Sequence, residues 1–175
     1  HGNGTESVAG AGLSYLSTHA FPAYPGTGAR SYRRSDDLVV NVPLPATGVS
    51  TEAFVAVWEE LLPVVARAAH PGLLIVSAGF DYVAGDMVGD LGVGVEAAGP
   101  LAAVIYRVAA EHCGGSVAYV LEGGYDVDAL TRSIALIAEV NDAGGSSRES
   151  ADPTAIPRDV RGNMQASLKI FQGGL

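Results

Sequence analysis

The stretch LLIVSAGFD, residues 73–81, decides the fold class of this chain of 175 residues. Its apolar residues form an unbroken run, whereas a strand with one face in water alternates apolar and polar side chains. An unbroken run predicts a strand covered on both faces, as in a parallel sheet between layers of helices. The run ends at Gly79 and delivers Asp81 to a turn, and reactive groups collect beyond the carboxyl ends of such strands. We therefore expect the chemistry of this chain near Asp81.

A second stretch repeats this layout further along the chain. Residues 117–121, VAYVL, predict a buried strand, and EGGYD follows at residues 122–126. Amphipathic patterns predict helices at about 97–112 and 127–140, so strands and helices alternate. This order indicates an α/β fold, a three-layer αβα sandwich with a mainly parallel sheet. Asp81 and Tyr125 are expected at the same edge of that sheet.

The flanking segments extend the pattern. Two further strands are predicted at residues 13–17 and 38–44, with a loop rich in proline, glycine and aromatics at 21–28. A helix is expected from about residue 51, with a kink or break at Pro63, because proline cannot donate the interior hydrogen bond. Residues 82–96 form a long glycine-rich loop that carries Asp86 and Asp90 and looks functional.

Composition limits the function classes. The chain has 10 Lys and Arg against 19 Asp and Glu, a net charge of -9. Nucleic-acid binding needs clustered basic residues, so no nucleic-acid partner is expected. The acidity serves either solubility or a basic partner such as a lysine-bearing peptide. The lone Cys113 excludes an internal disulfide framework and a Cys-rich zinc cage. Neither a membrane-spanning run nor a signal-peptide pattern occurs, which predicts no membrane contact and a reduced, cytoplasmic setting.

Asp81 and Tyr125 each leave several roles open when the residues are considered alone. An Asp on a turn after a buried strand is a metal ligand, a general base, a helix cap or an inert surface acid. Glycines beside Tyr125 allow the backbone to approach a ligand while the phenol donates a hydrogen bond. The same Gly-Gly-Tyr pattern also suits an ordinary turn.

Four local patterns together narrow these choices. They are HGNGT at residues 1–5, YPGTG at 24–28, SAGFD at 77–81 and LEGGYD at 121–126. In this order and rough spacing, the chain resembles the histone deacetylase superfamily over about residues 13–143. The resemblance is to the class II and bacterial deacetylase-like branch, which includes relatives of acetoin utilisation proteins and acetylpolyamine amidohydrolases. It implies an arginase/deacetylase-type fold, of which this chain carries the carboxyl-terminal half, and hydrolysis of an acyl amide on a lysine or similar amine.

The resemblance also implies roles for individual residues. Asp81 matches a ligand of the catalytic zinc, and the phenol of Tyr125 matches the donor to the carbonyl oxygen of the substrate. Ser17 matches a residue beside a structural potassium ion. Six residues match the substrate channel: Tyr24, Gly79, Phe80, Val88, Gly123 and Gly124. His1 and Asn3 match residues that orient or support the site.

The resemblance further suggests a division of the chain. Residues 1–143 are expected to belong to the catalytic domain, 144–157 to a linker, and 158–175 to an amphipathic helix that docks on the body or on a partner. In the family an Asp-x-Asp-x-His-His pattern precedes Gly-Asn-Gly, and His1 matches only the last position. Two of three zinc ligands and a pair of histidines therefore lie outside this chain. A sheet cut at this point would expose an unpaired strand edge and an apolar face.

These departures set the functional expectations. The 175 residues alone are expected to bind zinc weakly and hydrolyse nothing, unless a missing N-terminal segment or a second copy in a homo-oligomer supplies the rest. Val88 stands where the polyamine-selective branch carries an acid, which favours an acylated lysine peptide over an acylated small amine. Two alternatives stay open: a non-catalytic module that binds acyl ligands, and a generic α/β protein that binds small molecules, although no phosphate-binding glycine motif occurs.

Overall fold

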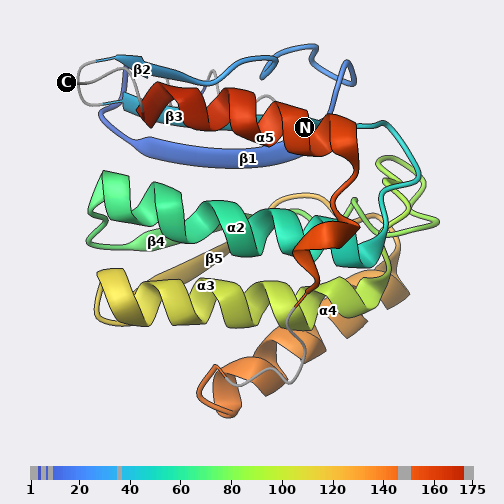
Figure 1. The fold of residues 1–175 in the computed structure, drawn as a ribbon. Helices are drawn as coiled ribbons and strands as arrows, with labels where there is room; N and C mark the ends of the chain where they lie inside the picture. The colour runs from blue at the N-terminus through green and yellow to red at the C-terminus, as the bar shows by residue number, and fades with distance from the viewer. Residues whose placement is uncertain (1–3, 5–6, 8–9, 35–36, 146–150, 172–175) are drawn as a thin grey trace. The chain divides into compact units, whose positions relative to one another are not determined.

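Parallel strand pairing organises both structural units of this chain. The structure is a computed structural model and describes residues 4, 7, 10–34, 37–145 and 151–171. One unit comprises residues 1–47 and 156–175, and the other comprises residues 48–155. Helices and parallel strands occur in both, which confirms the α/β class (Figure 1).

The first unit is a three-stranded sheet with one helix on it. β1 (Ser14–Ala20) pairs parallel with β3 (Asp37–Leu44), and β2 (Tyr32–Arg34) pairs antiparallel with β3, in the order β1-β3-β2. α5 (Arg158–Leu168) packs on β3, and η3 (Lys169–Phe171) follows it. The Ser167 hydroxyl donates to the Asn41 carbonyl at 2.6 Å, and the Asn163 amide donates to the Pro43 carbonyl at 2.8 Å. These bonds fix α5 on its sheet.

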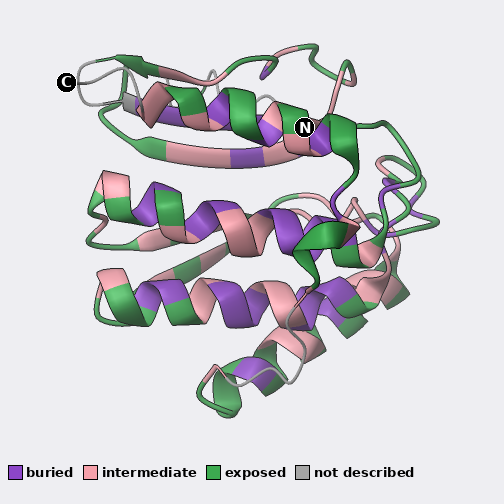
Figure 2. Ribbon diagram, in the orientation of Figure 1, coloured by how far each residue is buried: buried purple, intermediate pink, exposed green. Residues whose placement is uncertain are grey.

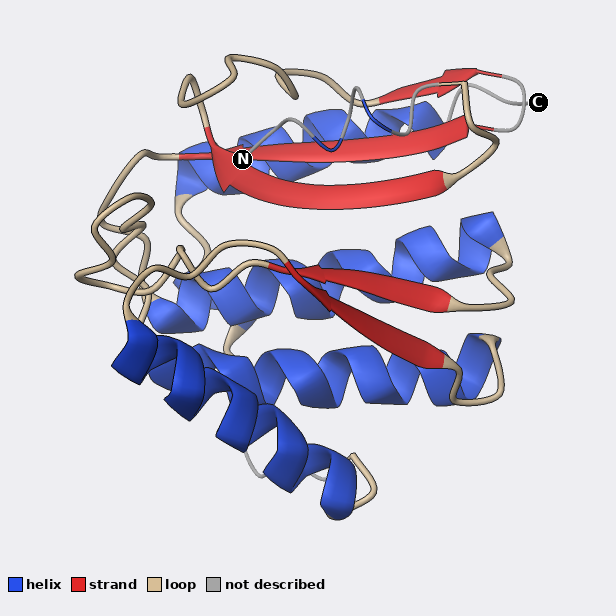
Figure 3. Cartoon of the chain, turned by 180° about the vertical axis from the view of Figure 1, so that it is seen from behind, coloured by secondary structure: helices blue, strands red, loops and turns tan. Residues whose placement is uncertain are grey.

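The second unit contains the SAGFD and EGGYD motifs. Its elements are α2 (Thr51–Ala69), β4 (Leu74–Ala78), η1 (Val95–Ala97), α3 (Ala98–His112), β5 (Val117–Leu121), α4 (Val127–Asp142) and η2 (Pro153–Ala155). β4 and β5 pair in parallel, with Leu74 opposite Val117 and Ala78 opposite Leu121. Figures 1 and 3, seen from opposite sides, place α2 and α3 on the same face of this strand pair.

The opposite face of the β4–β5 pair is exposed. Ile75 is 66% exposed and Val120 is 48% exposed, while their strand neighbours on the helix side are partly buried (Figure 2). The apolar run therefore does not have the two-sided cover that its pattern predicts. Among the described residues α2 and α3 cover one face, and the apolar face expected of a partial sheet is present.

Pro63 does not break α2 into two helices, which was one of the two outcomes that the sequence predicts at this residue. The helix runs from Thr51 to Ala69 without interruption, and the Ser50 hydroxyl caps it by accepting from the Ala53 N–H at 3.1 Å. Proline costs one interior hydrogen bond. Buried side chains on both sides of Pro63, including Leu61 and Val65, hold the two turns against the core and offset that cost.

Candidate active site

The turns that follow β4 and β5 lie side by side. Ala78 and Leu121, the last residues of the two strands, are paired in register. Beyond them the Glu122 N–H donates to the Ala78 carbonyl at 3.1 Å, and the Phe80 N–H donates to the Gly123 carbonyl at 3.0 Å. The backbone pairing therefore continues past both strands and brings the SAGFD and EGGYD motifs together at one edge of the sheet.

Two glycines leave the space that the Asp81 carboxylate occupies. A β-carbon built on Gly123 would lie 2.9 Å from Asp81 Cγ and 3.0 and 3.1 Å from its two oxygens. A β-carbon on Gly79 would lie 3.1 Å from Asp81 Oδ1. Contacts below 3.0 Å require something to move, so a side chain at position 123 would displace the carboxylate. Glycine is needed here for close approach of the two strands' turns.

Asp86 connects the long loop after β4 to the EGGYD turn. Its Oδ2 accepts from the N–H groups of Tyr125 at 2.7 Å and Asp126 at 3.1 Å. Its Oδ1 accepts from the N–H groups of Val88 at 2.9 Å and Gly89 at 3.2 Å. Each oxygen therefore accepts two backbone hydrogen bonds: Oδ1 from the loop after β4, and Oδ2 from the EGGYD turn.

The Asp86 side chain is buried and charged. Only 5% of the residue is exposed. Burial by itself would raise the pKa of the Asp86 carboxyl, but the four N–H donors together lower that pKa below its ordinary value. The group is ionised at neutral pH. Sequence reasoning placed Asp86 in a loop that looks functional, but no local pattern indicates its partners across the turn.

Tyr125 stands between two fixed points of the backbone. Its N–H is held by Asp86, and the next residue, Asp126, begins α4 by accepting from the N–H groups of Asp128 at 2.9 Å and Ala129 at 3.0 Å. The side chain itself is 49% exposed. The phenol is therefore available to a ligand while its backbone is anchored.

The remaining predicted channel residues of this unit differ in exposure. Val88 is exposed on the loop that Asp86 organises. Phe80 is buried, and its ring centroid lies 6.4 Å from that of Tyr82, which in turn lies 5.0 Å from that of Phe54. The Phe80 ring belongs to this aromatic cluster, and the channel roles of Phe80 and Val88 stay predictions. Gly124 has φ 120°, and a β-carbon there would lie 3.0 Å from the Phe80 β-carbon.

Tyr24 and Ser17 belong to the first unit. Tyr24 is 74% exposed, in a loop closed by the Gly26 N–H donating to the Ala23 carbonyl at 2.7 Å. Ser17 is buried at the centre of β1, and its hydroxyl lies 2.9 Å from Nδ1 of His19. The potassium neighbour role stays a prediction, as does the channel role of Tyr24.

Sequence reasoning missed His19, which ties β1 to the YPGTG loop. Its Nε2 lies 3.1 Å from the Gly28 carbonyl, and because a carbonyl only accepts, the ring proton is on Nε2. Nδ1 then accepts from the Ser17 hydroxyl. Burial lowers the pKa of His19, in keeping with a neutral ring. Its position at the end of a predicted strand, just before a shaped loop, was the available signal.

Asp81 is the zinc-ligand candidate that the described residues provide. They hold no group of three or more His, Cys, Asp or Glu side chains placed to bind a metal ion. His1 and Asn3, the predicted orienting residues, lie outside the described residues. The arrangement can therefore supply one oxygen ligand and one phenol donor to a site completed by other residues.

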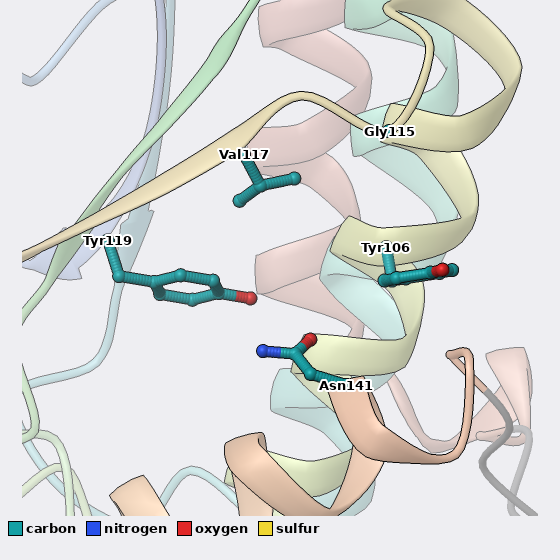
Figure 4. Close-up of a pocket in the computed structure, with 5 residues that line it drawn as sticks. All are labelled: Tyr106, Gly115, Val117, Tyr119 and Asn141. Carbon is teal, nitrogen blue, oxygen red and sulfur yellow. The ribbon is translucent and has the colours of Figure 1, made fainter.

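A pocket of about 190 Å³ lies beside Val117 and Tyr119 in the first part of β5 (Figure 4). Its lining consists of Tyr106, Gly115, Val117, Tyr119 and Asn141, none of which carries a charge at neutral pH. Burial raises the pKa of the Tyr119 phenol, which keeps it protonated. The pocket thus contains none of the predicted catalytic or metal-binding residues.

Comparison with known proteins identifies the family to which this chain is similar. Residues 1–140 match the histone deacetylase domain family. The chain is 36% identical over 140 residues to histone deacetylase 14, chloroplastic, of Arabidopsis thaliana, covering 77% of this chain and 33% of that protein. It is 31% identical over 133 residues to a probable deacetylase of Archaeoglobus fulgidus, covering 73% of this chain and 37% of that protein. The chain thus spans about a third of the length of these relatives.

The fold likewise resembles a solved deacetylase. The structure of the histone deacetylase Clr3 matches with a TM-score of 0.78 and 27% identity, over 97% of this chain and 29% of that chain. The likeness confirms a deacetylase-type α/β fold of which this chain forms a part. Together with the domain match over residues 1–140, it shows that the chain belongs to the histone deacetylase family.

Proposed function

We propose that the complete protein containing these residues is a zinc-dependent amidohydrolase that removes an acyl group from lysine or a related amine. One observation chiefly supports the proposal. The Phe80–Gly123 hydrogen bond holds the turns of Asp81 and Tyr125 together at one sheet edge, where a metal ligand and an oxyanion donor can serve the same carbonyl. Membership of the family and the deacetylase names of the relatives agree with it.

Asp81 suits the role of a zinc ligand. Carboxylate oxygens bind zinc, and Gly79 and Gly123 leave space around this carboxylate. A catalytic zinc site has three protein ligands and an open position, of which Asp81 supplies one. A bound zinc would supply Lewis acidity, polarising the amide carbonyl and lowering the pKa of a water molecule. Residues 1–175 alone should accordingly bind zinc weakly and show no turnover.

Tyr125 supplies the hydrogen-bond donor in this proposal. Its half-exposed phenol donates to the substrate carbonyl oxygen as negative charge develops there, and the proton stays on the phenol. Removing one such donor costs about 10²- to 10³-fold in kcat. Because the backbone of Tyr125 is anchored at Asp86 and Asp126, little reorganisation is needed during the reaction.

The substrate and setting follow from the surroundings. Val88 is an exposed apolar side chain near the site, which favours an acyl-lysine peptide over a polyamine. The net charge of -9 favours a basic substrate. None of the described helices combines the length and apolar character needed to cross a membrane. The proposal also includes a structural potassium ion near Ser17, a cytoplasmic location and assembly into a homo-oligomer.

An acetyl-lysine reporter tests the proposal on the complete gene product. We expect turnover that a chelator abolishes and zinc restores, and a Tyr125→Phe variant should lose about 10²-fold in kcat. Tyr106→Phe is the matched control, because it removes the phenol oxygen of a residue that lines the pocket beside Val117 and Tyr119 and should leave kcat unchanged. Zinc-independent binding of the acyl peptide without turnover would instead favour a binding module. If the protein neither binds nor hydrolyses the acyl peptide, that result would favour a generic α/β protein that binds small molecules.

A further inference from the structure

Asp86 is a buried carboxylate whose two oxygens each accept from two backbone N–H groups. The four N–H groups lie at 2.7 to 3.2 Å, and within the described part of the chain they are the donors to these oxygens. A group so occupied is not available to bind metal or substrate. Its effect must pass through the residues that it holds.

The hydrogen bonds to Asp86 fix the backbone of Tyr125, which the residues just before it in the sequence restrict little. Gly123 and Gly124 precede Tyr125, and glycine restricts the backbone least of all residues. Gly124 adopts φ 120°, and the bonds that tie this turn to β4 and its turn are made by Glu122 and Gly123, before Gly124 and Tyr125. The phenol is half exposed, so side-chain packing holds it only partly. The shortest of the four bonds, at 2.7 Å, goes to the Tyr125 N–H.

We propose that Asp86 is a positioning residue for Tyr125, fixing the backbone from which the phenol reaches the reacting carbonyl. This inference rests on the proposed role of the phenol in amide hydrolysis. The charge matters as well as the shape, because N–H donors bind an ionised acceptor more strongly. An amide at this position would keep one oxygen and lose the other acceptor, leaving two backbone donors without a partner.

The helix that follows does not account for this arrangement. The Asp126 carboxylate caps α4 by itself, accepting from the N–H groups of Asp128 and Ala129. Asp86 therefore acts on the turn before the helix. It also holds the N–H groups of Val88 and Gly89 in the loop, so the test has to separate an effect on Tyr125 from an effect on that loop.

A double-mutant cycle in the complete gene product makes this separation. Asp86→Asn should lower kcat for an acetyl-lysine reporter by about 10²-fold with little change in KM, since the phenol donor is misplaced. In a Tyr125→Phe background, the same substitution should cost no further activity, because the group that it positions is already gone. Losses that multiply, or a rise in KM that accounts for the effect, would overturn the proposal in favour of a general structural role.

Asp90→Asn is the matched control. Asp90 lies in the same loop, is exposed, and accepts from the nearby Gly92 N–H at 3.2 Å. The control makes the same change of charge and should leave kcat unchanged. If Asp86→Asn fails to fold, the cycle is repeated with Asp86→Glu, which keeps the charge and moves the acceptor by one methylene. Asp86→Glu, like Asp86→Asn, should then cost no further kcat in the Tyr125→Phe background.

Amide hydrogen exchange separates this inference from the proposed function. In Asp86→Asn the segment that contains Tyr125 and Asp126 should exchange roughly tenfold faster than in the wild type, whereas Asp90→Asn should leave it unchanged. A wild type without turnover would refute the proposed function, and the exchange rates would still decide whether Asp86 anchors the turn. Unchanged exchange in Asp86→Asn would overturn the anchor itself.

Discussion

The carboxylate of Asp81 lies within 3.1 Å of the place where a β-carbon on Gly123, a residue of the neighbouring strand's turn, would stand. A β-carbon at Gly123 would come within 2.9 Å of the carboxylate carbon. Gly123 does not have a left-handed φ angle, so the backbone itself would accept alanine. Space, and not conformation, therefore requires glycine at this position.

Gly123→Ala should displace Asp81 without straining the backbone. We expect the zinc affinity of the complete protein to fall by about 10- to 100-fold, because groups that orient a metal ligand typically contribute that much. Competition with a chelating dye would measure it. Gly72→Ala is the control, because a β-carbon there meets nothing within 4 Å and it belongs to the same unit. Equal zinc affinities for the two variants would contradict this account of Gly123.

The Asp86 anchor should fail in acid. The folded-state pKa of Asp86 lies below the ordinary value of 3.8, so its stabilising contribution is complete well above that value and declines as pH falls through the folded-state pKa. Asp86→Asn should cost about 3 kcal/mol in unfolding free energy at pH 7, since charged hydrogen bonds are lost. Urea unfolding at several pH values should show this difference constant above pH 5 and shrinking below about 3.8. A difference that grows in acid would refute the anchor.

The sequence predicted the features that local patterns specify. The helix expected at 97–112 occupies Ala98–His112, and the two strands with their glycine-rich ends lie at one edge. Hydrophobic periodicity and turn residues act over a few positions, so they can be recognised along the chain. The exposure of Ile75 is different, because it depends on which elements cover the sheet.

Contacts between distant residues were the part that the sequence could not predict. Asp86 and Tyr125 are 39 positions apart, and nothing in either local motif indicates that a carboxylate on one binds the backbone of the other. The continuity of α2 through Pro63 is a second case, because tertiary packing of Leu61 and Val65 outweighs the local cost of proline. The burial of the Phe80 ring is a third case, because its packing near Tyr82 depends on the tertiary structure.

Gly162 offers a stabilising substitution in α5. The residue is exposed inside the helix, and a β-carbon there meets nothing within 4 Å. Alanine should raise the unfolding free energy by about 0.5–1 kcal/mol, because it restricts the unfolded chain and favours the helix. Gly26→Ala, in the same unit and equally uncrowded, should be destabilising because φ is +79°. Thermal unfolding of both variants checks the prediction, and a loss of stability in Gly162→Ala would contradict it.

His19 should make the stability of the protein fall in mild acid. Burial holds the folded-state pKa of His19 below the ordinary value of 6.5, while the unfolded chain binds the proton at that value. The unfolded state therefore takes up more protons as pH drops through 6.5, and folding stability falls with it until the folded-state pKa is reached. His19→Gln removes the titrating ring, so its stability should depend less on pH than that of the wild type. Urea unfolding at pH 7.5, 6.5 and 5.5 compares the two slopes, and parallel curves would show that protonation of His19 is not linked to folding.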